Sequence, residues 1–202
     1  ADLSQKQPES LYCPSCNQTF AIRNGILCMI DPDEEKRLDV FSQQYRELRL
    51  KQGWRPMTPA EMMTLPNGDP PGYDKMYWPV RRQSFQMLKK LLNKLDTQPS
   101  KGVVLDLGAG NGWMSFRLAE LGYRVIALEP SMDPDFGLGQ IFRYQQKAPG
   151  MILPVRATFE TAPIGHQSVT TIIFNASLHY STDLTKTLKA MGRLLQPKGR
   201  II

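Results

Sequence analysis

Short apolar runs alternate with amphipathic segments along the second half of the chain. The apolar runs are typical of buried strands, and they contain Val103, Val125, Val155, Ile172 and Ile202. Amphipathic segments that predict helices lie at 113–121, 139–147 and 182–195. This alternation predicts an α/β fold with a doubly wound, mostly parallel sheet whose strands are linked by right-handed crossovers.

Two further helices are predicted in the first half. Apolar side chains recur at helical spacing between residues 38 and 50, so one face of this helix is expected to be buried. That face carries Leu38, Phe41, Tyr45 and Leu48. The segment 80–95 is the second helix, and its core face carries Phe85, Leu88, Leu92 and Leu95.

The segment 52–79 lies between these helices and is rich in proline and glycine, which argues against regular elements. It also contains the aromatic residues Trp54, Tyr73, Tyr77 and Trp78, whereas disordered segments are poor in such residues. Two interpretations follow. The segment is either an ordered wrap or lid over a binding cleft, or a linker strapped to the outside of the domain.

The composition is that of an ordinary globular protein, with 202 residues of which 41% are apolar and 22% charged. No apolar run approaches the roughly 18 residues of a membrane span, and the first ten residues do not resemble a signal peptide. We therefore expect a cytoplasmic protein without a membrane partner. The net charge of +6 permits an RNA partner but does not require one, because the basic residues are spread along the chain.

The stretch V-V-L-D-L-G-A-G-N-G, residues 103–112, is the centre of the predicted fold. A strand-like run enters three glycines and then a helix. Glycines allow positive φ and close approach of a ligand, and a helix start offers free N–H groups to an anion. Trp113 stands where a dinucleotide fingerprint requires Gly or Ala, which argues against NAD. Asp106 and Glu129 end two successive strand-like runs, where we expect them to face a nucleoside ligand.

Together, D-L-G-A-G-N-G and A-L-E-P resemble the first two motifs of the class I S-adenosylmethionine-dependent methyltransferases, and the resemblance extends over 88–202. It implies a Rossmann-like sheet and S-adenosylmethionine as cofactor. In that family the glycine loop passes under the methionine part of the cofactor, and the acid that ends the second strand holds the ribose. The cofactor-binding residues implied by these motifs are Asp106, Gly108, Gly110, Asn111, Gly112 and Glu129.

The third and fifth motifs of the family also have counterparts. The run L-P-V-R-A followed by Thr158 and Phe159 resembles the third strand and the residues beside the adenine. An acid is common near Ala157 in the family, and this chain has none there. The run L-L-Q-P-K-G, residues 194–199, resembles the turn into the fifth strand.

The fourth motif, residues 170–180, resembles the strand and loop that close the active site in small-molecule methyltransferases of the quinone-biosynthesis type. Asn175 is expected beside the cofactor or a polar acceptor. His179 is the best candidate for a catalytic base, because imidazole titrates near neutral pH. A structural histidine bonded to the backbone is the competing interpretation.

The start of the helix at 80–95 commonly overhangs the cofactor in this family, which makes Tyr77, Arg81 and Arg82 candidates for contact with it. An arginine fork there would pair with the methionine carboxylate, and we predict Tyr77 and Arg82 as cofactor-binding. The alternative is that one of these arginines is an exposed helix residue.

Residues 11–29 contain Cys13 and Cys16 in a Cys-x-x-Cys motif, and an Asn24-Gly25 pair suited to a hairpin turn. The pattern resembles the second knuckle of small zinc-ribbon-like modules that precede some methyltransferases. A structural zinc needs four ligands, so two cysteines are half a site. A first knuckle upstream, ligands from a partner, and a metal-free hairpin are three explanations that stay open.

The sequence therefore predicts three parts. These are a hairpin module at 1–32, a helix with a lid or wrap at 33–79, and a methyltransferase domain at 80–202 that stops inside its fifth strand. The predicted function is methyl transfer from S-adenosylmethionine to a small-molecule acceptor. The alternatives are an RNA methyltransferase, since some rRNA enzymes carry an N-terminal zinc module, and an inactive methyltransferase-fold partner subunit.

Overall fold

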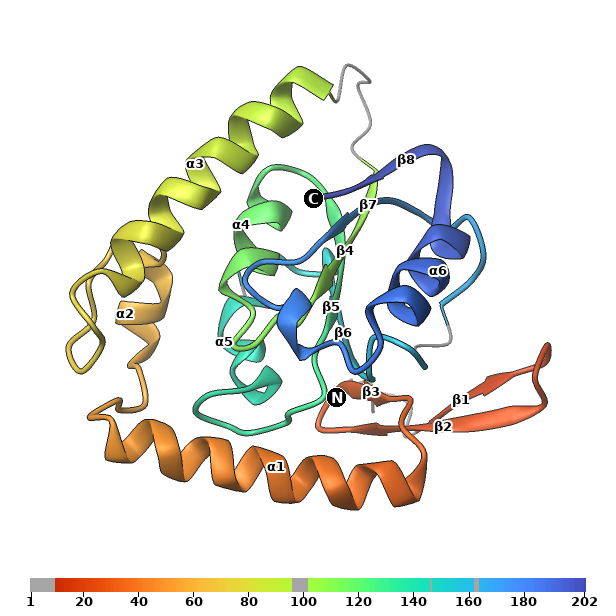
Figure 1. The fold of residues 1–202 in the computed structure, drawn as a ribbon, viewed down its shortest axis with the longest axis horizontal. Coiled ribbons are helices and arrows are strands. Elements are labelled where there is room, and N and C mark those ends of the chain that lie inside the picture. Colours follow the sequence, from red (N-terminus) through yellow and green to blue (C-terminus); the bar gives the residue numbers. More distant parts are fainter. Residues whose placement is uncertain (1–9, 96–101, 146, 162–163) are drawn as a thin grey trace, which may run out of the picture.

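The computed structural model describes residues 10–95, 102–145, 147–161 and 164–202. Its centre is an eight-stranded sheet with the order β1-β2-β3-β6-β5-β4-β7-β8 (Figure 1). The strands are β1 Ser10–Cys13, β2 Gln18–Arg23, β3 Ile26–Cys28, β4 Val103–Leu107, β5 Arg124–Leu128, β6 Ile152–Arg156, β7 Val169–Ile173 and β8 Leu195–Ile201. The last five pair in parallel, which confirms the predicted doubly wound α/β sheet.

Helices cover both faces of this sheet. The described α-helices are α1 Pro32–Lys51, α2 Pro59–Thr64, α3 Tyr77–Leu95, α4 Trp113–Glu120, α5 Phe142–Gln145 and α6 Leu184–Leu194. Two short 3₁₀ turns lie at Leu138–Gln140 and Leu178–Tyr180. Helices α3 and α4 lie on one side of the sheet and α6 on the other (Figure 1). None of the described helices is both long and apolar enough to cross a membrane.

The alternation of side chains along β4 divides the core in two. Val104 packs in the cluster that contains the buried residues of α3 and α4. Leu105 and Leu107 pack in the second cluster, with Met191 and Leu194 of α6. Successive residues of a strand point to opposite faces, so one short strand anchors both helical layers.

The N-terminal hairpin continues the sheet at one edge. Strands β1 and β2 pair antiparallel, and β3 pairs in parallel with β6 through Leu27 opposite Val155. The turn between β2 and β3 contains Asn24 at φ 50° and Gly25 at φ 74°, as the Asn-Gly pair predicts. The division into separate domains at residues 32 and 79 stays a prediction.

The prediction that 52–79 lacks regular structure is wrong for α2. Pro59 occupies the first turn of that helix, where its missing N–H is not needed. Thr58 and Glu61 form a capping box in which the Thr58 side chain accepts from the Glu61 N–H and the Glu61 carboxylate accepts from the Thr58 N–H. Local capping therefore permits a short helix within a proline-rich segment.

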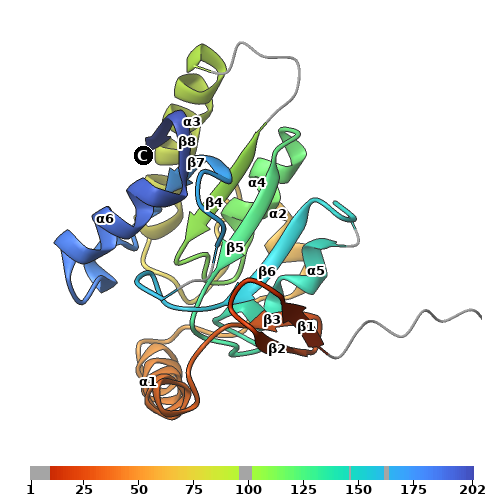
Figure 2. The ribbon, with the colours of Figure 1, turned by 90° about the vertical axis from the view of Figure 1, so that its right-hand side faces the viewer.

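The prediction of a buried face on the first helix is also wrong. The helix α1 begins at Pro32, capped by Asp31, and none of its residues, all of them described, is buried. It lies beyond the ends of the parallel strands, where the loops after β4 and β5 emerge (Figures 1 and 2). Its apolar stripe therefore faces the loops at the carboxyl edge of the sheet.

Candidate functional site

A cavity of about 820 Å³ lies between α1 and the carboxyl ends of β4, β5, β6 and β7. The strands β5 and β7 flank β4 on opposite sides, so β4 stands where the strand order reverses. In open α/β sheets, the crevice at such a switch point is where ligands bind. The volume falls within the range of about 300–1,000 Å³ that is typical of small-molecule sites.

The glycine loop after β4 forms the floor of this cavity. Gly108, Gly110 and Gly112 have φ values of 75°, 53° and 82°, a region that favours glycine. A Cβ at Gly108 would lie 2.4 Å from Ser177 Cβ, so this residue is fixed by packing. A Cβ at Gly110 would meet no described atom within 4 Å, so its backbone borders open space.

Gly112 lies outside the cavity lining. It is the N-cap of α4, and a Cβ there would lie 2.8 Å from Ile141 Cγ1. Asn111 lines the cavity, and its side-chain oxygen accepts a hydrogen bond of 3.2 Å from the Trp113 N–H. The absence of a side chain at Gly112 therefore allows the close packing of Ile141, whereas Asn111 is accessible from the cavity.

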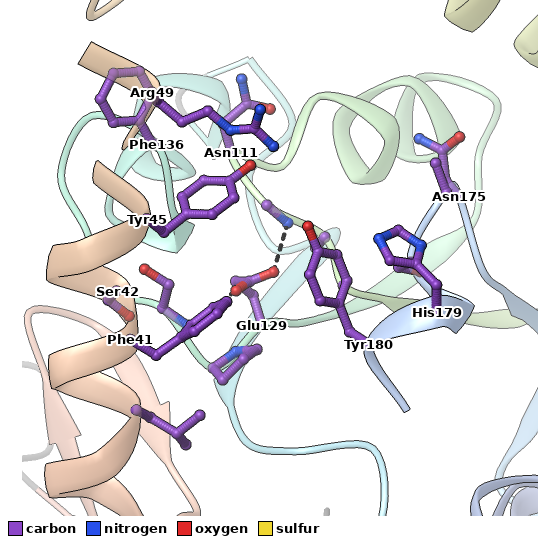
Figure 3. Close-up of a pocket in the computed structure, with 18 of the residues that line it drawn as sticks. Phe41, Ser42, Tyr45, Arg49, Asn111, Glu129, Phe136, Asn175, His179 and Tyr180 are labelled. Carbon is purple, nitrogen blue, oxygen red and sulfur yellow. Dashed lines mark hydrogen bonds between the residues drawn. The ribbon is translucent and has the colours of Figure 1, made fainter. Parts of the chain in front are cut away.

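Glu129, which follows β5, joins this strand to the glycine loop. Its Oε2 accepts from the Gly110 N–H at 3.0 Å, and its Oε1 accepts from the Ser131 N–H at 3.0 Å. Figure 3 shows this carboxylate at the centre of the cavity. Burial raises the pKa of Glu129, and the neighbouring Asp106 carboxyl adds to the rise.

The prediction that Asp106 faces the cofactor needs correction. This residue is fully buried and lies outside the cavity lining. Its Oδ2 accepts from Ser115 Oγ at 2.6 Å, whereas Oδ1 has no partner among the described residues. Burial raises the pKa of Asp106 to about 6. The carboxyl therefore supports the start of α4 from below the loop.

Thr158 and Phe159, which were predicted beside the adenine, line the cavity beyond Glu129, and so does Asn175, which was predicted beside the cofactor or a polar acceptor. The Phe159 ring is held edge-on against Phe174, with the ring centroids 5.6 Å apart. Arg156, which precedes this loop, donates from Nε to the Pro130 carbonyl oxygen at 3.0 Å. Its guanidinium therefore extends away from Thr158.

His179 and Tyr180 form the other wall of the cavity, on the 3₁₀ turn after β7 (Figure 3). Both side chains are exposed, and their ring centroids lie 4.1 Å apart. Partial desolvation at the cavity raises the pKa of Tyr180, and Tyr45 of α1 adds to the rise. The turn and α1 therefore approach each other across the cavity mouth.

The helix α3 brings Tyr77 to the cavity but turns Arg82 away. Arg82 donates from Nη2 to the Asn67 carbonyl oxygen at 2.6 Å and pairs with Asp69 at 3.3 Å. Arg82 therefore lies outside the cavity lining, and its contact with the cofactor stays an untested prediction. Arg81 lines the cavity instead, because residues one position apart on a helix point about 100° from each other.

The sequence did not predict that α1 lines the cavity. Its inward side chains line the cavity from above: Leu38, Phe41, Ser42, Tyr45 and Arg49. Trp54 and Tyr73 also line the cavity; they belong to the segment 52–79, which we call the wrap. The helical spacing of apolar residues in 38–50 was the signal, but the pattern reveals an apolar face without revealing what covers it.

Cys13 and Cys16 lie in and after β1, on the hairpin and away from the cavity lining. Within residues 10–95 and the other described ranges, no group of three or more His, Cys, Asp or Glu could hold a metal ion. Cys28 is part-buried, and its thiol lies 3.6 Å from the Ile26 carbonyl oxygen. Two thiols do not complete a tetrahedral zinc site, so zinc binding stays a prediction.

The sequence of the second half matches a known family. Residues 105–202 match the methyltransferase domain. The chain is 33% identical over 111 residues to the malonyl-[acyl-carrier protein] O-methyltransferase of Yersinia pestis, covering 55% of this chain and 39% of the relative. It is 27% identical over 133 residues to an uncharacterized methyltransferase of Geobacillus kaustophilus, covering 65% of this chain and 57% of the relative. The match therefore spans between about two fifths and three fifths of these relatives.

A solved structure shares the fold over nearly all of the chain. It is the 1,6-didemethyltoxoflavin-N1-methyltransferase of Burkholderia thailandensis, with bound 1,6-didemethyltoxoflavin and S-adenosylhomocysteine. The TM-score is 0.55 at 18% identity, and the alignment covers 96% of this chain and 71% of that one. The chain therefore has the Rossmann-like α/β fold of the class I methyltransferases, and its residues 105–202 are similar in sequence to the methyltransferase domain.

Proposed function

We propose that this protein transfers a methyl group from S-adenosylmethionine to a small-molecule acceptor in the cavity beneath α1. The observation that carries the proposal is a hydrogen bond at the switch point of the sheet. The Gly110 N–H donates to the Glu129 carboxylate at 3.0 Å. This bond brings a carboxylate and a bare glycine backbone to one point in a cavity of about 820 Å³.

The residues of the cavity fit this cofactor. The carboxylate of Glu129 suits the two hydroxyls of a ribose, because a carboxylate offers two acceptor oxygens. The open side of Gly110 suits a close-packed methionine chain. Phe159 and Thr158 suit the adenine, one as an apolar face and the other as a polar edge. Arg81 takes the role first predicted for Arg82, beside the methionine carboxylate.

When bound, S-adenosylmethionine supplies a methyl carbon on a positively charged sulfur. The protein's main task is to hold the acceptor atom in line with that carbon, because orientation alone removes much of such a barrier. An imidazole nitrogen of His179 takes the proton from an acceptor hydroxyl that must become nucleophilic. The Tyr180 hydroxyl is protonated at neutral pH, as that of any ordinary tyrosine is, so it is available to donate a hydrogen bond to an acceptor beside His179.

A small acceptor is favoured over RNA because α1 and the wrap cover the cavity. Phe41 and Tyr45 face Tyr180 across the cavity mouth (Figure 3). The Burkholderia thailandensis structure, which shares the fold over 96% of this chain, holds 1,6-didemethyltoxoflavin beside S-adenosylhomocysteine. The quinone-biosynthesis type and a cytoplasmic location stay predictions.

The test is calorimetric titration of S-adenosylmethionine and S-adenosylhomocysteine into the wild-type protein, Glu129→Ala and Glu120→Ala. Glu120 is a suitable control because it lies on α4 and pairs with Arg117 outside the cavity. We expect Glu129→Ala to weaken binding by roughly 1.5–3 kcal/mol and Glu120→Ala to leave it unchanged. Folded wild-type protein that binds neither compound would refute the proposal and favour an inactive partner subunit.

A further inference from the structure

The inward face of α1 carries Leu38, Phe41 and Tyr45 among polar side chains, and none of these three is buried in a protein core. Phe41 is 47% exposed although it lies on the side that lines the cavity. Its ring centroid is 6.2 Å from that of Tyr45, the next inward aromatic residue. Figure 3 shows both side chains pointing from α1 into the cavity toward Tyr180. An apolar ligand between these rings would supply the burial that α1 lacks.

Aromatic residues from the wrap extend this wall. The Trp54 ring lies 4.3 Å from Tyr73 and 4.9 Å from Tyr77, centroid to centroid. All three line the same cavity. The Trp54 ring is inclined by 43° to Tyr73 and by 78° to Tyr77, so this wall presents both ring faces and ring edges, which suit an aromatic ligand through offset and edge-to-face contacts.

Two arginines already occupy faces of these rings. The Arg49 guanidinium carbon lies 4.5 Å from the Tyr45 ring centroid and 4.3 Å from that of Trp54. The guanidinium carbon of Arg81 lies 3.4 Å from the Tyr77 centroid. A cationic ligand on the same rings would therefore meet like charges, so the aromatic wall does not act as a cage for an amine.

Arg49 also has unused hydrogen-bonding capacity. Its Nη1 donates to Gln52 Oε1 at 2.9 Å, but its buried Nε has no partner among the described residues. The side chain projects from α1 into the cavity (Figure 3). This Nε is covered by protein, so an anionic group in the cavity would pair with the terminal nitrogens of the guanidinium instead.

The acidic groups of the cavity are mostly engaged. Asp135 pairs with Arg46, and Glu160 accepts hydrogen bonds from Thr182 and Thr187. Glu129 accepts two backbone hydrogen bonds, as described above. Glu34 remains at the rim, where it is outnumbered by the three arginines of the lining: Arg37, Arg49 and Arg81.

We propose that the methyl acceptor is a planar aromatic acid, with its ring between the inward face of α1 and Tyr180 and its acidic group at Arg49. The inference rests on the proposed function and names its acceptor class. An aromatic acid that also carries a hydroxyl would present that hydroxyl to the wall formed by His179 and Tyr180. Arg49 and Phe41 are then specificity-determining residues for the acceptor.

The experiment uses wild-type protein saturated with S-adenosylhomocysteine, which carries no methyl group to transfer. Three probes are titrated by calorimetry: 4-hydroxybenzoate, tyramine, and 4-hydroxycyclohexanecarboxylate. The second probe keeps the ring but carries an ammonium group, and the third keeps the acid but lacks aromaticity. We expect 4-hydroxybenzoate to bind on the order of tenfold or more tightly than either of the others.

Matched variants assign the contacts. Arg49→Gln and Phe41→Ala should each weaken 4-hydroxybenzoate about tenfold or more and leave S-adenosylhomocysteine affinity within about threefold. Arg82→Gln and Val40→Ala are the controls, because both residues lie outside the cavity lining, and they should change neither affinity.

Three outcomes would overturn the inference. They are equal or tighter binding of tyramine, no binding of 4-hydroxybenzoate by protein that binds S-adenosylhomocysteine, and an Arg49→Gln effect confined to S-adenosylhomocysteine. The last would assign Arg49 to the cofactor. Wild-type protein that binds no S-adenosylhomocysteine would instead refute the proposed function, so the two failures are distinguishable.

Discussion

The Gly110 nitrogen lies 3.0 Å from Glu129 Oε2, so the loop after β4 and the residue after β5 form one hydrogen-bonded unit. The two parent strands are adjacent and paired from Val103 to Leu107. The sheet therefore determines the spacing of the two groups. This rigid joint is where we place the cofactor.

Substitutions of Gly110 and Gly108 should affect cofactor binding and the free energy of unfolding to different extents. Gly110→Ala adds a Cβ that meets no described atom within 4 Å, so only the positive φ of 53° opposes it. We expect a loss of roughly 1–2 kcal/mol in the free energy of unfolding, but loss of detectable S-adenosylhomocysteine binding.

Gly108→Ala is the matched comparison. Its Cβ would lie 2.4 Å from Ser177 Cβ, so we expect a larger loss of stability, about 3 kcal/mol or more. Chemical denaturation and calorimetry measure both quantities. Equal destabilisation by the two variants, or normal binding by Gly110→Ala, would contradict the assigned geometry.

The pH dependence of stability should report on Asp106. Its pKa is about 6 in the folded protein and near 4 when unfolded, so the native state binds more protons between these values. Stability from this group is present below about pH 4 and is lost as pH rises through about 6. The loss amounts to about 3 kcal/mol.

Asp106→Asn removes this titration. Urea unfolding of both proteins without cofactor at pH 4.5 and pH 8 gives a double difference in which the titration of other groups cancels. We expect the wild type to lose more stability than the variant over this interval. A double difference near zero would mean that the carboxyl stays ionised in the fold.

Cofactor affinity should fall in mild acid because of Glu129. Burial raises its pKa, so the carboxylate becomes protonated at a higher pH than an ordinary glutamate. A protonated carboxyl loses part of its capacity to accept from ribose hydroxyls. Titrations of S-adenosylhomocysteine from pH 8 to pH 5 should therefore show weakening that is absent in Glu129→Gln; a parallel decline in both proteins would assign the effect elsewhere.

The position of α1 should depend on Arg156. This side chain is 3% exposed and pairs with Glu35 and Asp39 of α1. Because α1 has no buried residue, we expect Arg156→Ala to loosen the helix and to remove roughly 2 kcal/mol of stability. Hydrogen exchange should accelerate in α1 much more than in β4.

Arg193→Ala, on the exposed side of α6, is the control for this prediction. It should leave exchange in α1 unchanged. If Arg156→Ala also leaves α1 protected, the ion pairs are not what holds the helix over the cavity.

The parallel sheet was predictable because its cause is local. Val104, Val125 and Ile172 lie in short apolar runs, and the glycines after Leu107 mark the point where a strand must turn into a helix. The predicted strand positions agree with β4, β5, β6 and β7 within a few residues, whereas β8 begins at Leu195, inside the predicted turn, and ends at Ile201. The hydrophobic pattern and the turn residues suffice to place a strand when both indicate the same position.

The side chains of the site were less predictable because direction depends on helix phase and on distant partners. The helix α3 begins at Tyr77 rather than at residue 80, and Arg82 finds Asn67 and Asp69 in the wrap. No pattern in the sequence gives that pairing. The apolar stripe of α1 was visible, but its neighbour is a cavity, which a periodicity does not reveal.

The most direct test of the central claim is a crystal structure of the protein with S-adenosylhomocysteine. The account predicts the ribose at the Glu129 carboxylate, the amino-acid part against Gly110, and the adenine beside Thr158 and Phe159. Density for the ligand at any other place, or a Glu129 carboxylate that stays bonded to Gly110 with the ligand bound elsewhere, would contradict it.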